Sequence, residues 1–155
     1  MDGSLSERLT EVIRKDPRYH AEAYHFVFEA LDYTVRSKYR AAESTSRGAT
    51  SAPNRHVNGQ DLLAGIRQFA LDCFGCLAAT VFESWGVRRG EDFGEIVFNL
   101  VEHGLMGKQD SDTRDDFAGG FEGRPFDEVF DVRPRLEYYP DRDEWKATYE
   151  NVAFG

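Results

Sequence analysis

The chain has 155 residues, a length suited to one domain that can bury a core without disulfides or metals. It carries 28 acidic against 19 basic side chains, and its net charge of −9 disfavours nucleic-acid backbones and anionic membranes as partners, because both would repel it. With only two cysteines, no apolar run of about 18 residues and no charged-then-apolar leader, the sequence predicts neither a membrane span nor a signal peptide. It favours a cytoplasmic protein.

Two helices are predicted in the first 40 residues. Ser4 and Glu7 have the spacing of a capping box, and the apolar residues that follow recur on one face, which predicts a helix over residues 5–15. Asp16 followed by proline is a strong start signal, with aspartate as N-cap and proline in the first helical position, and nothing breaks a helix over residues 18–40. This second helix is apolar nearly all round, as expected of a helix in the centre of a core.

A flexible loop is predicted over residues 41–57, which are small, polar or proline and show no periodicity. A third helix then begins, because Asn58 can act as N-cap and Asp61 places a carboxylate in the dipole-positive first turn. Its apolar side chains recur at spacings of three, four and seven and form one stripe: Leu62, Leu63, Ile66, Phe69, Ala70 and Cys73.

Two further helices follow, and both have the ending of a Schellman motif. The first ends at Gly86 with Val87 behind it. The second opens at Gly90 with acidic residues in its first turn and ends at Gly104 with Leu105 behind it. In this motif the glycine takes the left-handed conformation and the next apolar residue packs back on the helix. Three helices joined by short connections cannot each bury an apolar stripe alone, so the sequence predicts that they pack together.

The fold class is therefore predicted as mainly α. Residues 1–108 are expected to form a compact bundle of about five helices with a trihelical, helix-turn-helix-like core. Residues 109–155 are expected to form an acidic C-terminal strap and tail, anchored by four aromatic rings: Phe117, Phe121, Phe126 and Phe130. These rings are too apolar to be left free, so they should dock either on their own domain or on a partner. Two short segments, 136–139 and 146–149, flank a Pro-Asp-Arg-Asp turn and suggest a small β-hairpin.

Several stretches of the sequence resemble a family of uncharacterised small proteins found mainly in planctomycete and verrucomicrobial bacteria. They are residues 24–31 (YHFVFEAL), 56–67 (HVNGQDLLAGIR), 85–87 (WGV) and 91–102 (EDFGEIVFNLVE). The likeness covers most of the chain up to Asp131 and implies a bacterial cytosolic origin. It implies no activity, and the two cysteines lie outside the shared pattern.

Cys73 and Cys76 form a CxxC motif, with Cys76 near a helix start where the dipole favours a thiolate. A thioredoxin-like site would need a strand before the motif, and a zinc site would need two more ligands, whereas a helix precedes it and no second CxxC exists. The pair is predicted to fill a helix junction as small apolar side chains. A redox or metal role is the alternative.

Glu22, His25 and Glu29 form an ExxH with a second glutamate one turn further on. Di-iron bundles use two such motifs together with a glutamate from each of two other helices, and only one motif is present here. The sequence favours a structural histidine satisfied by a neighbouring carboxylate and leaves a metal site as the alternative.

The last two helices of the bundle also have the order of a winged-helix reader, with a wing tip near residues 112–114. The segment that would enter the DNA groove, residues 91–103, carries four acidic side chains and neither lysine nor arginine, so the phosphates would repel it. The main hypothesis is thus a non-enzymatic cytosolic protein-interaction or adaptor module that needs no cofactor. A winged-helix-like transcriptional regulator is an alternative. The partner is not identified from the sequence, and self-association is left open.

Overall fold

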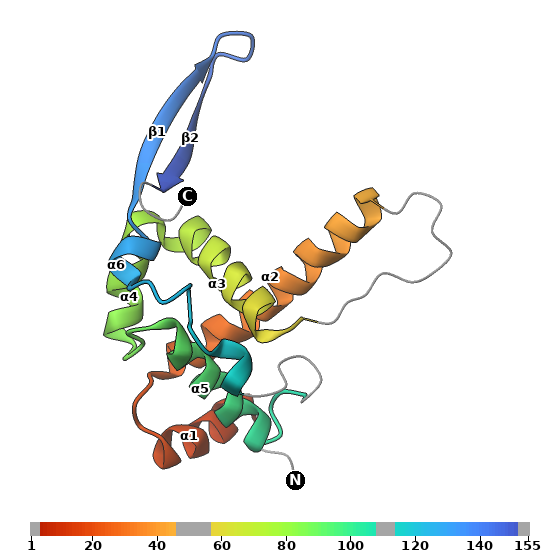
Figure 1. Ribbon diagram of the computed structural model, residues 1–155, viewed down its shortest axis with the longest axis vertical. Helices are drawn as coiled ribbons and strands as arrows, with labels where there is room; N and C mark the ends of the chain where they lie inside the picture. Colours follow the sequence, from red (N-terminus) through yellow and green to blue (C-terminus); the bar gives the residue numbers. More distant parts are fainter. Residues whose placement is uncertain (1–3, 46–56, 108–113, 152–155) are drawn as a thin grey trace.

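The computed structural model describes residues 4–45, 57–107 and 114–151. Its elements in chain order are α1 (Leu5–Lys15), α2 (Ala21–Thr45), α3 (Gly59–Phe74), the 3-10 turn η1 (Gly75–Leu77), α4 (Ala78–Ser84), α5 (Gly90–Glu102), η2 (Arg114–Phe117), α6 (Phe126–Val129), β1 (Val132–Tyr139) and β2 (Glu144–Asn151). Figure 1 shows the helices gathered in one body and the two strands extending away from it. The predicted mainly helical fold with a small hairpin is confirmed.

The predicted helix ends of the central segment are also confirmed. At the start of α3, Asn58 Oδ1 accepts the backbone N–H of Asp61 at 2.8 Å, and the Asp61 carboxylate accepts the N–H of Asn58 at 3.2 Å. At the end of α4, Gly86 has a φ of +86° and the N–H of Val87 donates to the carbonyl of Phe82 at 2.9 Å. The turn after α5 repeats this arrangement at its own glycine. Local sequence chemistry therefore determines where these helices begin and end.

Helix α2 begins later than the sequence predicted, at Ala21. Asp16 does not cap it, because its carboxylate accepts hydrogen bonds from the side chains of Arg18 and Asn99. His20 takes that place: its ring Nδ1 accepts the backbone N–H of Glu22 at 3.1 Å. The aspartate–proline pair thus lies in the connection between α1 and α2 rather than at a helix start.

The same helix also ends later than predicted, at Thr45. The flexible loop expected over residues 41–57 is therefore wrong for its first five residues, and its part from 46 to 56 lies outside the described residues. Nor is the helix apolar all round. Asp32 and Arg36 form an exposed ion pair of 3.0 Å on its outer side.

An aromatic cluster forms the centre of the core. Phe82 of α4 is fully buried, and its ring centroid lies 5.2 Å from that of Phe26 in α2 and 5.2 Å from that of Phe93 in α5, both in edge-on geometry. Such T-shaped pairs are the favoured arrangement of aromatic rings. The Phe82 side chain thus links α2 and α5, which are far apart in the sequence.

The chain beyond α5 closes this core. The four rings of the predicted strap are all buried, with relative exposures of 1% for Phe117, 5% for Phe121, 6% for Phe126 and 2% for Phe130. Gly94 lets Phe117 pack closely against α5, because a Cβ at position 94 would lie only 2.7 Å from the Cβ of Phe117. Of the two alternatives left open by the sequence, the structure therefore has these rings docked on their own domain. Residues 114–132 complete the helical body.

The hairpin lies outside the body, as does the C-terminal end of α2 (Figure 1). Strands β1 and β2 pair antiparallel, with Leu136 opposite Ala147 and Tyr139 opposite Glu144, so residues 140–143 form the predicted turn. Both strands are longer than the sequence indicated. Val132, at the base, is buried, whereas the rest of β1 is exposed or half-buried. Figure 1 shows the hairpin (blue) projecting from the end of the body near α4 and α6.

Candidate functional site

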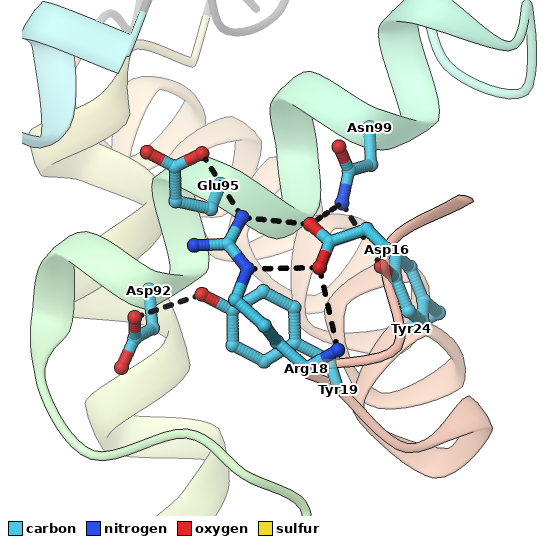
Figure 2. A network of polar contacts seen from close by, with 7 residues as sticks. All are labelled: Asp16, Arg18, Tyr19, Tyr24, Asp92, Glu95 and Asn99. Atoms are coloured by element: carbon cyan, nitrogen blue, oxygen red, sulfur yellow. Dashed lines mark hydrogen bonds and ion pairs between the residues drawn. The ribbon is translucent and has the colours of Figure 1, made fainter. Parts of the chain in front are cut away.

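A network of polar side chains joins the connection between α1 and α2 to helix α5 (Figure 2). Asp16 is at its centre: the guanidinium of Arg18 donates to both carboxylate oxygens, at 2.8 and 2.7 Å. The Asn99 side-chain amide donates to Asp16 at 2.9 Å and to the hydroxyl oxygen of Tyr24 at 3.1 Å. Asp16 and Asn99 are 83 positions apart in the chain, so no local pattern could have predicted this contact.

A second arm of the network reaches the start of α5. The hydroxyl of Tyr19 donates to Asp92 at 2.8 Å. The other Asp92 oxygen accepts the backbone N–H groups of Arg88 and Arg89, at 2.9 and 3.2 Å. Asp92 thereby satisfies two amides that precede the helix and fixes the position of Tyr19 at the same time.

The electrostatics of the network fix its protonation states. Hydrogen bonds from Arg18, together with the Asn99 amide, hold the pKa of Asp16 well below its ordinary value, against the opposing effect of burial. Burial raises the pKa of Tyr19, with a further contribution from its hydrogen bond to Asp92, and burial also raises the pKa of Tyr24. At neutral pH the aspartate is therefore ionised and both tyrosines keep their protons.

This arrangement is suited to holding the fold rather than to chemistry. A general base or acid works best with a pKa near the operating pH, and the shifts of Asp16, Tyr19 and Tyr24 all move away from neutrality. Among the seven residues in Figure 2, the Tyr19 hydroxyl is hydrogen bonded to the Asp92 carboxylate, but burial raises the pKa of Tyr19, so this hydroxyl stays protonated at neutral pH. The network's effect is to attach a non-helical connection to the buried helix α5.

The two cysteines do not fill a helix junction, and that expectation is wrong. Cys73 and Cys76 are both exposed, free thiols at the end of α3 and in η1. Partial burial raises the pKa of Cys73, and the nearby carboxylates of Asp72 and Glu29 raise it further. A raised pKa leaves less thiolate at neutral pH, which is the opposite of what a reactive redox cysteine requires.

The ExxH residues lie on the first turns of α2. Glu22 and Glu29 are exposed, and His25 is half-buried. Within the described ranges, no group of three or more histidine, cysteine or acidic side chains is arranged to hold a metal ion. The structure therefore does not bring Glu22, His25 and Glu29 together with ligands from other helices, as a bundle metal site would need.

The helix that would read DNA in a winged-helix protein is enclosed here. Seven of the thirteen residues of α5 are buried: Gly90, Phe93, Gly94, Ile96, Val97, Asn99 and Leu100. The strap covers part of this helix, since Phe117 packs against Gly94. The position of the expected wing tip, residues 112–114, lies largely outside the described residues. The α5 residues that are not buried include Glu91, Asp92, Glu95 and Glu102, and the phosphates of a DNA groove would repel their negative charge.

The hairpin presents an apolar face that nothing in the described chain covers. Side chains alternate between the two faces of a strand, so Leu136 and Tyr138 of β1 share a face with Trp145 and Ala147 of β2. Leu136 is 66% exposed, Trp145 65% and Tyr138 45%. The Tyr138 and Trp145 rings contact each other, with centroids 5.0 Å apart. The face is thus formed by large apolar groups that remain in contact with water.

The opposite face of the hairpin is polar and pairs within itself. Glu137 lies directly across from Lys146, and Arg133 lies across from Glu150. The Lys146 ammonium also lies 5.4 Å from the centroid of the Tyr139 ring. Opposite charges placed directly across a strand pair stabilise it modestly. The hairpin is therefore amphipathic: charged side chains on one face lie opposite charges of the other sign, and the apolar face is uncovered. The sequence analysis identified the strands but missed this asymmetry, although the alternation of residue types was its signal.

One helical run in the described residues, Gly59–Ser84, is long and apolar enough by composition alone to cross a membrane. It comprises α3, η1 and α4. Core helices of soluble proteins pass the same test, and Leu62, Leu63 and Ile66 of this run are in the core. The finding is weak evidence for a membrane span.

No protein-family model, curated protein or solved structure matches this chain. The resemblance to the planctomycete and verrucomicrobial family therefore stays a prediction.

Proposed function

We propose that this chain is a non-enzymatic protein-interaction module of the cytosol, and that its docking element is the C-terminal hairpin. The observation that carries the proposal is the uncovered apolar face, in which Leu136, Tyr138 and Trp145 are each at least 45% exposed. An exposed group of large apolar side chains of this kind typically marks an interaction site. Aromatic residues in particular dominate the binding energy of protein interfaces.

The proposed docking surface is not the set of aromatic rings that the sequence predicted. Phe117, Phe121, Phe126 and Phe130 are buried in the core, so they support the fold and have no exposed ring to offer. The candidate redox and metal residues support no competing activity, since Cys73 has a raised pKa and the ExxH has no further ligands among the described residues. Two free cysteines fit a reducing cytosol.

The test is a capture experiment with immobilised full-length protein and cytosolic extract of the source cells. The Leu136→Thr/Trp145→Thr variant removes the apolar face and keeps residues that favour strands. Its matched control is Glu137→Thr/Lys146→Thr, on the opposite face of the same strands. We expect the wild type and the control to retain the same protein and the apolar variant to lose it. Equal capture by all three proteins would show that the face is not the docking element.

Truncation after Lys108 would not be a suitable variant. It removes Phe117, Phe126 and Phe130, all of which are buried in the core, together with the hairpin. Loss of binding would then report unfolding of the body rather than loss of the docking element. The exposed point substitutions avoid this ambiguity, because surface changes usually alter stability by less than about 0.5 kcal/mol.

A further inference from the structure

The charge of the hairpin limits the kind of partner that fits its apolar face. Residues 132–151 contain four basic and five acidic side chains, so the hairpin is close to neutral within a chain of net charge −9. Most of the charges on its polar face are matched across the strands, as with Glu137 and Lys146. A nucleic acid or a highly charged peptide would need a surplus of one sign. A partner that fits this face should therefore be apolar and nearly neutral.

These charges are not spread evenly along the hairpin. Its base has a net charge of +1, from Arg133, Arg135 and Glu150. Its tip has a net charge of −2, from Asp141, Arg142, Asp143 and Glu144. The middle pair is neutral. A second hairpin laid over the first in the reversed direction would therefore place an acidic tip against a basic base at both ends.

The charge of the body favours the same reversed orientation. Outside the hairpin the chain has fifteen basic and twenty-three acidic side chains, a net charge of −8. Figure 1 shows that the body lies at the base of the hairpin, opposite the tip. In a reversed pair the two bodies lie at opposite ends, separated by a strand length of roughly 26 Å, which is about three Debye lengths at physiological salt. In a parallel pair two acidic bodies and two acidic tips would be adjacent, whereas in the reversed pair each body faces only the smaller negative charge of one tip.

We propose that the occupant of the hairpin's apolar face is a second copy of this chain, packed antiparallel about a two-fold axis. This inference rests on the proposed function and names its partner. In such an isologous interface the same patch is used by both copies. Leu136 and Ala147 lie near the axis, and Tyr138 of each copy lies over Pro134 of the other. Pro134 is exposed on the same face and offers a flat apolar surface to an aromatic ring.

The size of the face predicts a weak and reversible dimer. Two strands of eight residues have a footprint of roughly 26 by 10 Å. The area buried by both copies together is then well below the roughly 1,200 Å² of a stable interface. The protein should be a monomer at low micromolar concentration and a dimer as it approaches the millimolar range.

Sedimentation equilibrium of the full-length protein across that concentration range tests the dimer. We expect the Leu136→Thr/Trp145→Thr variant to raise the dissociation constant on the order of tenfold or more. The polar-face control, Glu137→Thr/Lys146→Thr, should dimerise as the wild type does. Thermal unfolding of all three proteins at low concentration verifies that the body is intact. A wild type that stays monomeric at millimolar concentration, or a dimer that survives the apolar variant unchanged, overturns the inference.

Pulsed dipolar spectroscopy tests the orientation. A spin label at Asp141→Cys, in a Cys73→Ser/Cys76→Ser background, reports the distance between the two tips. The antiparallel pair should give a separation of roughly 30 Å, close to the length of the hairpin, whereas a parallel pair should give about 10 Å. The short distance, or no dipolar coupling at millimolar concentration, would contradict the proposed arrangement.

Failure of this inference and failure of the proposed function have different signatures. If the wild type stays monomeric while only the apolar variant loses a captured cytosolic protein, the second copy is not the occupant and the interaction module stands. If the wild type dimerises and the apolar variant does not, the second copy is the occupant, whether or not another protein is captured. If neither dimerisation nor capture depends on Leu136 and Trp145, both proposals fail.

Discussion

Replacing Phe126 with alanine tests whether the strap is part of the cooperative core. The ring is 6% exposed, and its centroid lies 5.7 Å from that of Phe82, 6.1 Å from Phe93, 5.9 Å from Phe121 and 5.4 Å from Phe130. Truncation of a buried phenylalanine costs about 3–5 kcal/mol, because apolar contacts are lost and a cavity is left. Each edge-on ring pair contributes a further amount of about 0.5–1.5 kcal/mol beyond its buried area. We therefore expect a loss near the upper end of that range.

The expected loss converts into a large shift of the thermal midpoint. For a protein of this size, 1 kcal/mol corresponds to about 2–4 °C, so a loss of about 4–5 kcal/mol in Phe126→Ala should lower Tm by about 8–20 °C. Urea and thermal unfolding followed by far-ultraviolet circular dichroism measure the change, and Trp145→Ala, at a site 65% exposed, is the control that should shift Tm by less than about 2 °C. Adding Phe130→Ala should cost less than the sum of the two, because the rings touch. A Phe126→Ala midpoint within about 2 °C of the wild type would refute the reasoning.

Three further predictions concern the network, the closest helix contact and the thiols. Asp16→Asn should lower the free energy of unfolding at pH 7 by about 1.5–3 kcal/mol, the usual contribution of hydrogen bonds to a charged group. Because the pKa of Asp16 is lowered in the folded state, this stabilisation is present above the unfolded pKa of about 4 and is lost as the pH falls toward the folded value. Urea unfolding should therefore show a smaller difference in unfolding free energy between the wild type and Asp16→Asn at pH 3 than at pH 7. An equal difference at both pH values would contradict the assignment. Gly65→Ala should destabilise by about 1–3 kcal/mol, since its Cβ would overlap Thr34 Oγ1. Adding Thr34→Ala should restore only part of the loss in a double-mutant cycle, because the Thr34 Cβ would still lie 2.8 Å from the new Cβ, whereas additive losses would place the strain elsewhere. In a Cys76→Ser protein, Cys73 should react with a disulfide reagent more slowly than free cysteine at pH 7 and faster as the pH rises, because its pKa is raised; a rate above that of free cysteine would instead support the redox alternative.

Helix boundaries set by neighbouring residues could be read from the sequence. The capping box of Asn58 and Asp61 involves residues three positions apart, and the Gly86–Val87 ending involves one turn of helix. Such interactions are complete within the segment that shows them. The prediction therefore depended little on how the rest of the chain packs.

Where a distant residue competes for the same group, local chemistry predicted the wrong outcome. Asp16 before proline is a valid helix start by itself, yet its carboxylate is bound by Arg18 and by Asn99, which belongs to α5. The position of Asn99 depends on how α5 packs, and no pattern near Asp16 contains that information. The prediction that Cys73 and Cys76 fill a helix junction was wrong for a related reason: the place of Cys73 at the end of an apolar stripe could not show that both thiols are exposed.

The hairpin shows a different limit of sequence reasoning. Alternation predicts which side chains share a face, so Leu136, Tyr138, Trp145 and Ala147 could be grouped in advance. It cannot show whether the body lies against that face. In the structure the strap ends the core at Val132 and the strands continue past it, so the apolar face is left open. Exposure of this face depends on the tertiary packing, and the proposed function depends on that exposure.

Under the proposed function, stability and binding reside in different parts of this chain. Three of the five large apolar side chains exposed among the described residues belong to the hairpin: Leu136, Tyr138 and Trp145. An isolated two-stranded hairpin is only marginally stable in water, so a partner that covers the apolar face would also stabilise the paired strands. The buried rings, by contrast, keep the body folded whether or not the hairpin is occupied.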